Sequence, residues 1–297
     1  MPNGTIELND ATVDYERKGE GPPLLFIPGG SGHGGVLERL TTRLADTYDV
    51  VTMCSRVASQ QKPGTVLGEQ HPKVHAEDAV AVIDALFEEA PIVVGFSSGA
   101  ITTLELLAHH PGHVRLAVVH EPPLMNLLPE AERLRAEMAS VRASARAEDF
   151  AEAAVTITAT MVDTDIRFEA PALRRFGTWA DGYADTAPEP PNPELLELLG
   201  RLGELQPVFL GHMLVPFTGY EPDLPALAAQ AERLVLAVGV DSHKDLPFQT
   251  TAALASRLGL PVAELPGGHL GSVDRPTQFA EALKSLLNAN SGHVPPQ

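Results

Sequence analysis

The chain has 297 residues, of which 39 are acidic and 21 are basic, so its formal net charge at pH 7 is −18. This acidic balance argues against binding to nucleic acid or to anionic membrane surfaces, because both favour clustered lysine and arginine. The only cysteine is Cys54, which excludes a disulfide within the chain. With no apparent signal peptide and no apolar run of membrane-spanning length, we expect a soluble cytoplasmic protein.

Short apolar runs alternate with amphipathic stretches along the first 120 residues. Residues 5–8 and 11–15 alternate in polarity around an Asn-Asp pair, which predicts an N-terminal hairpin. Residues 23–27, 49–53, 92–94 and 114–120 are largely apolar, which is typical of strands buried on both faces of a parallel sheet. The stretches between them predict helices over residues 36–44, 73–89 and 100–109.

The alternation stops after Glu121-Pro122-Pro123 and resumes only at residue 234. The interruption predicts four helices, over residues 129–145, 147–164, 170–182 and 193–205, with a proline-rich break at 187–191. Strands at 234–238 and 262–265 and helices at 246–258 and 277–288 follow. We therefore expect an α/β fold with a mostly parallel sheet flanked by helices. Residues 1–123 and 231–297 would form its core, and residues 124–230 a helical lid inserted after the sixth strand, above the carboxyl edge of the sheet.

A G-x-S-x-G pattern stands between a predicted strand and a predicted helix, at Gly95-Phe96-Ser97-Ser98-Gly99. A serine on such a sharp turn needs glycine on both sides, because a side chain there would clash with the neighbouring strand and helix. The turn would present the Ser97 hydroxyl at the end of the sheet. The alternative is an ordinary glycine-rich turn, and we expect Ser97 to be a nucleophile.

A serine nucleophile needs a base that is itself held by a carboxylate. The candidate base is His269, in the glycine-rich loop after the last predicted strand. Two acids are candidates for its partner. Asp241 follows the penultimate strand, and Glu121 follows the strand after the nucleophile helix. Both preserve the chain order serine, acid, histidine, and either could instead be an ordinary loop or capping carboxylate.

An oxyanion hole needs two backbone N–H donors aimed at the developing negative charge. Ser98 would supply one, and we expect Gly30, in the glycine-rich loop over residues 28–35, to supply the other. A phosphate-binding loop is the competing interpretation, but the lysine and the glycine spacing that it requires are missing. His33 in the same loop either lines the mouth of a pocket or faces solvent. No histidine or acid has metal-ligand spacing, so we expect neither a metal nor a cofactor.

Over nearly its whole length the chain resembles the α/β-hydrolase superfamily, through the Pro-Gly-Gly loop, the Gly-Phe-Ser-Ser-Gly-Ala turn and Pro-Gly-Gly-His-Leu-Gly. It more closely resembles zearalenone lactonases and actinobacterial hydrolases with a His-Glu-Pro-Pro element, which stands here at His120-Glu121-Pro122-Pro123. The resemblance implies the α/β-hydrolase fold and favours Glu121 over Asp241 as the acid. It also implies that Trp179, in Trp-Ala-Asp-Gly-Tyr, contacts substrate, although Trp179 could equally belong to the lid's own core.

These features predict a cofactor-independent serine hydrolase that cleaves an ester or lactone of a fairly apolar small molecule, a macrocyclic lactone such as zearalenone included. We expect Met125, Trp179, Phe209 and Met213 to supply apolar walls of the substrate pocket. Two other functions use the same features: a biosynthetic thioesterase or cyclase-type hydrolase, and a ligand receptor built on a hydrolase scaffold. The oligomeric state stays open, a homodimer included.

Overall fold

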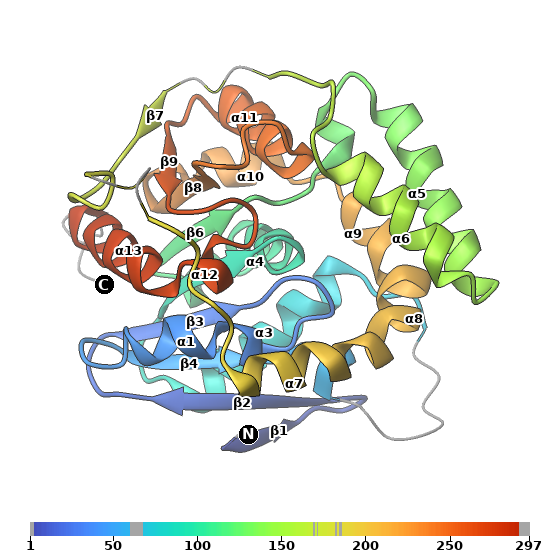
Figure 1. The fold of residues 1–297 in the computed structure, drawn as a ribbon. Helices are drawn as coiled ribbons and strands as arrows, with labels where there is room; N and C mark the ends of the chain where they lie inside the picture. The colour runs from blue at the N-terminus through green and yellow to red at the C-terminus, as the bar shows by residue number, and fades with distance from the viewer. Residues whose placement is uncertain are drawn as a thin grey trace.

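A single sheet organises the molecule. The computed structural model describes residues 3–59, 68–168, 170, 172–181, 183 and 186–290, and these form nine strands in the order β1-β2-β4-β3-β5-β6-β8-β9-β7 (Figure 1). The hairpin β1 (Gly4–Glu7) and β2 (Thr12–Lys18) is antiparallel, and β2 joins β4 (Asp49–Met53) in the same way. From β4 onward all neighbours are parallel, through β3 (Pro23–Ile27), β5 (Ile92–Phe96), β6 (Leu116–His120), β8 (Leu234–Gly239), β9 (Val262–Leu265) and β7 (Leu173–Arg174).

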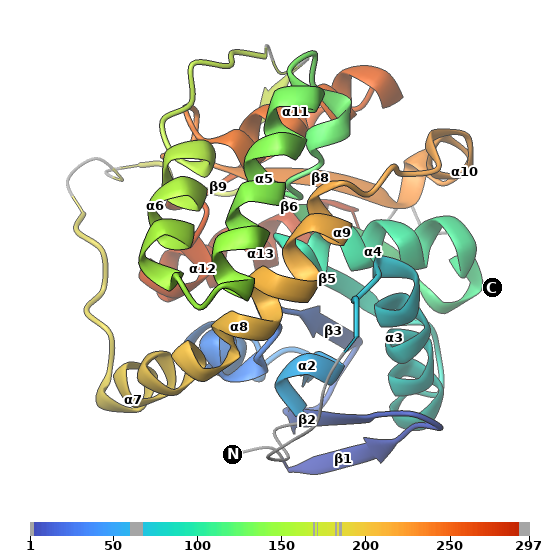
Figure 2. The ribbon, with the colours of Figure 1, turned by 90° about the vertical axis from the view of Figure 1, so that its right-hand side faces the viewer.

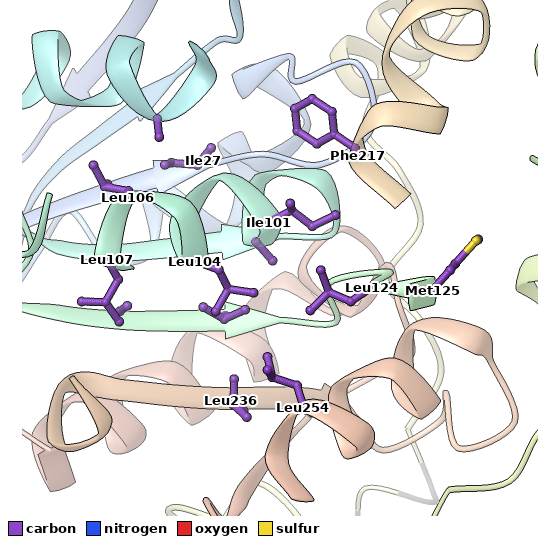
Figure 3. Close-up of a cluster of buried hydrophobic side chains, with 14 of the residues drawn as sticks. Ile27, Ile101, Leu104, Leu106, Leu107, Leu124, Met125, Phe217, Leu236 and Leu254 are labelled. Carbon is purple, nitrogen blue, oxygen red and sulfur yellow. The ribbon is translucent and has the colours of Figure 1, made fainter. Parts of the chain in front are cut away.

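The central strands are continuously apolar because helices cover both faces of the sheet. In β3, Leu25 and Ile27 enter one apolar cluster, while Leu24 and Phe26 enter the cluster on the opposite face. The first cluster also takes side chains from α3 (Pro72–Leu86), α4 (Ser98–His109) and α11 (Leu246–Leu258), and Figure 3 shows part of it. The second is covered by α1 (Glu38–Thr42) and α13 (Pro276–Asn290).

An insertion separates β6 from β8, as predicted. Its longer helices are α5 (Ala131–Arg146), α6 (Phe150–Met161) and α7 (Pro193–Leu202). Further along, α8 (Gln206–Val208), a π-helical turn η6 (Phe209–Met213) and α9 (Leu214–Thr218) follow one another without a break. Figures 1 and 2 show α5 and α6 side by side, with α9 against α5. The Thr164 N–H donates to the Lys244 carbonyl at 2.9 Å, in the loop that follows β8. The insertion therefore lies over the carboxyl ends of the strands.

Short elements complete the chain. They are η1 (Gly34–Leu37), α2 (Arg56–Ser59), η2 (Pro111–His113), η3 (Met125–Leu127), η5 (Gly203–Leu205), α10 (Leu224–Ala228), η7 (Ala231–Arg233) and α12 (Gly271–Asp274). The helix predicted over residues 36–44 is thus a 3-10 turn followed by the short α1. No helix in the described part of the chain combines the length and apolar character that crossing a membrane requires.

The helix predicted over residues 170–182 is wrong for the described part of that range. Leu173 and Arg174 instead form β7, which pairs with Val262 and Ala263 of β9 at the edge of the sheet. Gly177 then has φ +79°, which interrupts any right-handed helix. Both β7 residues are exposed, so backbone pairing with the sheet edge, rather than burial of an amphipathic helical face, decides the conformation.

Candidate active site

Ser97 occupies a strained turn between β5 and α4. Its φ is 52° and its ψ is −115°, a conformation that costs a non-glycine residue energy and must be held by its surroundings. Its N–H donates to the His120 carbonyl at 2.9 Å, which anchors the turn to β6. The flanking glycines allow the close packing, because a Cβ on Gly95 or on Gly99 would lie 2.2 Å from Thr103 Oγ1 or from the Ile27 carbonyl oxygen, respectively.

His269 and Glu121 form the hydrogen-bonded pair of the site. His269 Nδ1 lies 2.7 Å from Glu121 Oε2, and the Glu121 side chain is fully buried. Burial alone would raise the pKa of the Glu121 carboxyl, but the hydrogen bonds from His269 and Ser242 and the nearby imidazoles lower it below its ordinary value. A carboxylate at Nδ1 selects the tautomer that leaves Nε2 free to accept a proton.

The second oxygen of Glu121 is held as firmly as the first. Oε1 accepts hydrogen bonds from the Gly239 N–H at 2.8 Å and from the Ser242 hydroxyl. Glu121 itself has φ 52°, and its N–H donates to the Ala237 carbonyl of β8 at 3.1 Å. The carboxylate is thereby fixed at the carboxyl ends of β6 and β8, with both of its oxygens occupied.

Asp241 has a different partner. Its Oδ2 accepts a hydrogen bond of 2.6 Å from the Tyr183 hydroxyl, while its backbone N–H donates to the Gly267 carbonyl at 2.9 Å. The structure thus brings Glu121, and not Asp241, against the imidazole of His269.

The two expected oxyanion donors belong to neighbouring backbone segments. Gly30 has φ +61° with open space around its Cβ position, and its carbonyl accepts a hydrogen bond of 3.0 Å from Ser98 Oγ. Ser98 is the first residue of α4, so its N–H has no carbonyl partner within that helix. A Cβ on Gly29 would lie 2.8 Å from Ser97 Cβ, which places the glycine loop directly against the serine.

The five residues expected to line the pocket lie in different surroundings. Met125 is fully buried in the apolar cluster beside Leu124 (Figure 3). Met213, also buried, lines with Ser98 a cavity of about 10 Å³ that has room for one water molecule. Phe209 is partly buried in the π-helical turn.

Trp179 and His33 complete this set. The Trp179 side chain is buried and packs edge-on against the Tyr183 ring, with 5.4 Å between the ring centroids. His33 Nδ1 accepts the Gly35 N–H at 3.1 Å, and burial together with the charge of Arg201 lowers the pKa of its imidazole. His33 therefore caps the 3-10 turn η1 in its own loop.

Two residues that sequence reasoning missed stand beside the expected ones. Ser242 directly follows Asp241, and its hydroxyl binds Glu121. Tyr183 ends the Trp-Ala-Asp-Gly-Tyr string that drew attention to Trp179, and its hydroxyl binds Asp241. Adjacency to a candidate acid is a signal for the first, whereas nothing in the sequence places the second. Within the described residues, no group of three or more histidine, cysteine, aspartate or glutamate side chains is arranged to hold a metal ion.

A mostly parallel sheet with a serine on a strained strand–helix turn, and a buried carboxylate on a histidine from the loop after the last core strand, defines an α/β hydrolase. Comparison with known proteins agrees, because residues 24–282 match the model of the alpha/beta hydrolase family. The chain belongs to this family, and it is a hydrolase.

Two curated relatives and one solved structure illustrate the similarity. The chain is 26% identical over 298 residues to the uncharacterized hydrolase YraK of Bacillus subtilis (strain 168), covering 98% of each protein. It is 26% identical over 282 residues to the zearalenone hydrolase of Bionectria ochroleuca, covering 92% of each. A thermophilic esterase from Thermogutta terrifontis superposes with a TM-score of 0.70 at 14% identity, covering 97% of this chain and 99% of that one, which supports the fold.

Proposed function

We propose that this hydrolase cleaves a carboxylic ester or lactone through an acyl-enzyme on Ser97, without a cofactor. The observation that carries the proposal is the 2.7 Å contact between His269 Nδ1 and the buried carboxylate of Glu121, at the sheet edge where Ser97 stands on its strained turn. The contact supplies a base with a fixed tautomer, which is what a serine hydroxyl needs to become a nucleophile.

The chemistry follows in two half-reactions. Ser97 Oγ attacks the substrate carbonyl carbon while His269 Nε2 takes the hydroxyl proton, and the Gly30 and Ser98 N–H groups bind the resulting oxyanion. Collapse of this intermediate breaks the ester C–O bond, and His269 returns the proton to the leaving alkoxide oxygen. Water, deprotonated by the same imidazole, then attacks the acyl carbon. Collapse of this second intermediate breaks the bond to Ser97 Oγ, His269 returns the proton to that oxygen, and the carboxylic acid is released. Throughout, Glu121 stabilises the imidazolium and keeps its orientation.

For the substrate we propose a fairly apolar lactone, with macrocyclic lactones such as zearalenone as the first compounds to assay. The zearalenone hydrolase of Bionectria ochroleuca aligns over 92% of this chain. Met125, Trp179, Phe209, Met213 and His33 remain proposed substrate contacts, to be tested by substitution after the serine.

The decisive experiment measures hydrolysis of a lactone and aryl-ester panel by the wild-type protein and by Ser97→Ala, together with covalent labelling by a fluorophosphonate. We expect turnover that depends on Ser97, and a single adduct that peptide mass mapping assigns to Ser97. Wild-type turnover retained by Ser97→Ala would contradict the mechanism. Turnover of acyl thioesters alone would favour a thioesterase, and tight lactone binding without turnover would favour a receptor.

The acid is tested separately with two matched neutral amides. Glu121→Gln should lower kcat on the order of 10⁴-fold, because the amide can hold the imidazole in the wrong tautomer. Asp241→Asn should change kcat little. Equal losses in the two variants would remove Glu121 from the role proposed for it.

A further inference from the structure

The loop that carries His269 is clamped from outside the core. Gly267, two residues before His269, donates its N–H to the Tyr183 hydroxyl oxygen at 2.7 Å. The same hydroxyl donates to Asp241 Oδ2 at 2.6 Å, and the Asp241 N–H returns a bond of 2.9 Å to the Gly267 carbonyl. Both polar groups of Gly267 are thus held in one closed ring of hydrogen bonds, which Tyr183 completes from the insertion.

The clamped glycine controls the direction of the loop. Gly267 has φ +84°, and a Cβ on it would lie 2.5 Å from the Gly271 Cα, so the chain doubles back tightly between these residues. The Gly271 N–H closes this bend by donating to the Gly268 carbonyl at 2.9 Å. Rotation of the peptide before Gly267 would therefore swing the bend, and with it the His269 imidazole, away from Glu121.

Tyr183 is itself fixed in place. The Arg275 guanidinium lies 4.5 Å from the centroid of its ring, and Nη1 of this arginine donates to the Thr186 hydroxyl at 2.9 Å. Burial, and then the hydrogen bond to Asp241, raise the pKa of the phenol to about 12, so the hydroxyl keeps its proton at ordinary working pH. The group can therefore act as a permanent donor to Asp241.

A second attachment holds the segment that carries Tyr183. Glu189 accepts the Thr277 N–H at 2.9 Å and pairs with Arg39 at 2.9 Å, while its own N–H donates to the Asp274 carbonyl at 2.7 Å. Figure 1 shows the segment that leads to α7 passing beside α12, which begins two residues after His269. The insertion thus contacts the chain on both sides of His269, at Gly267 before it and at Asp274 after it.

We propose that Tyr183 is a positioning residue that fixes the His269 loop through Gly267, and that Asp241 is its anchoring carboxylate. The inference rests on the proposed function, since it assigns a role toward the histidine of that site. It also accounts for a second acid at the carboxyl edge of the sheet that does not contact the imidazole. The contacts that hold the insertion on the core then also hold the His269 imidazole in position.

The test compares Tyr183→Phe with Tyr220→Phe. Both tyrosines belong to the insertion and donate to a carboxylate, Tyr220 to Glu105 Oε2 at 2.5 Å, but Tyr220 lies on the α4 side and not at the histidine loop. We expect Tyr183→Phe to lower kcat about 10- to 100-fold with KM within twofold, because misplacing a reacting group by about 1 Å costs that much. Tyr220→Phe should keep the wild-type kcat.

Substitutions of Asp241 test whether it acts together with Tyr183. Asp241→Asn keeps an oxygen acceptor for Tyr183 and should restore most of the activity that Asp241→Ala loses. The double variant Tyr183→Phe/Asp241→Ala should be no slower than either single variant, because both remove the same clamp. Additive losses would mean that the two residues act independently and would overturn the inference.

A spectroscopic signature separates positioning from general destabilisation. The Nδ1 proton shared by His269 and Glu121 should give a downfield proton NMR signal that disappears in Glu121→Gln. It should broaden or shift in Tyr183→Phe and persist in Tyr220→Phe. An active wild-type enzyme with Tyr183→Phe unchanged in kcat and signal, or changed in KM alone, would refute the positioning role. A wild-type protein without Ser97-dependent turnover would instead refute the proposed function.

Discussion

Lowering the pH from 8 to 5 should destabilise the folded chain, and His120 should account for a defined part of the loss. Its side chain is fully buried between the rings of Phe96 and Phe279, whose centroids lie 5.5 and 5.6 Å from its own. Within the described residues neither of its ring nitrogens has a hydrogen-bond partner. A protonated imidazole in this position would be a buried charge without a hydrogen-bond partner.

The magnitude follows from the shift of the imidazole pKa. Burial, the largest cause, lowers the pKa of His120 to about 4 despite the opposing charge of Glu121, whereas an unfolded histidine titrates near pH ~6.5. The unfolded state therefore takes up the proton first. The contribution to stability is complete above about pH 6.5 and is lost as the pH falls toward 4. At pH 5, about 1.5 pH units into this window, the loss is roughly 2 kcal/mol, at ~1.36 kcal/mol per unit.

The assay is urea unfolding of the wild-type protein and of His120→Phe at pH 8 and pH 5. The wild-type protein should lose about 2 kcal/mol more than the variant over this interval, because phenylalanine cannot titrate. A size effect of the larger ring cancels, since each protein is compared with itself. As a control, His71→Gln removes an exposed histidine, and its free energy of unfolding should fall between pH 8 and pH 5 by as much as that of the wild type. If the wild type and His120→Phe lost equal unfolding free energy between pH 8 and pH 5, His120 would not be the source of the predicted loss.

Three further predictions concern packing and charge. Gly99→Ala would place a Cβ 2.2 Å from the Ile27 carbonyl oxygen and should destabilise the fold by about 1–3 kcal/mol in thermal unfolding, whereas Gly112→Ala, with open space, should not. Cys54 is buried and its thiol pKa is raised to about 11, so Ellman's reagent should titrate it only after denaturation; reaction in the native state would contradict its burial. Arg56→Met strands the buried Asp78 carboxylate and should cost about 3–5 kcal/mol in urea unfolding, a loss that a second change, Asp78→Leu, should largely recover.

The strands that support the site could be predicted from local composition. Residues 23–27 and 49–53 coincide with β3 and β4, and residues 92–94 lie within β5, because each is apolar on both faces and each face is covered. The strained turn at Ser97 was predictable for a related reason, since the flanking glycines are required by contacts within a strand–turn–helix unit.

Local composition does not predict a conformation that depends on pairing at the sheet edge or on contact with a distant segment of the chain. The conformation of residues 173–174 depends on backbone pairing with β9, some ninety residues later, and the π-helical turn at residues 209–213 leaves no periodic signal. The same limit applies to Tyr183, whose partners Asp241 and Gly267 lie in other loops.

By itself the sequence determined the α/β arrangement, the insertion after the sixth strand, and the loops at the carboxyl edge in which a nucleophile and a base could stand, because these follow from hydrophobic period and glycine position. The order of the residues along the chain left both Glu121 and Asp241 open as partners of His269, and only the tertiary structure shows which one contacts the imidazole. Glu121 and Asp241 follow the adjacent strands β6 and β8. Both carry a carboxylate, and both lie between the serine and the histidine along the chain. Their side chains diverge because Glu121 adopts φ 52° and binds Gly239 and Ser242, while Asp241 is engaged by a tyrosine from the insertion.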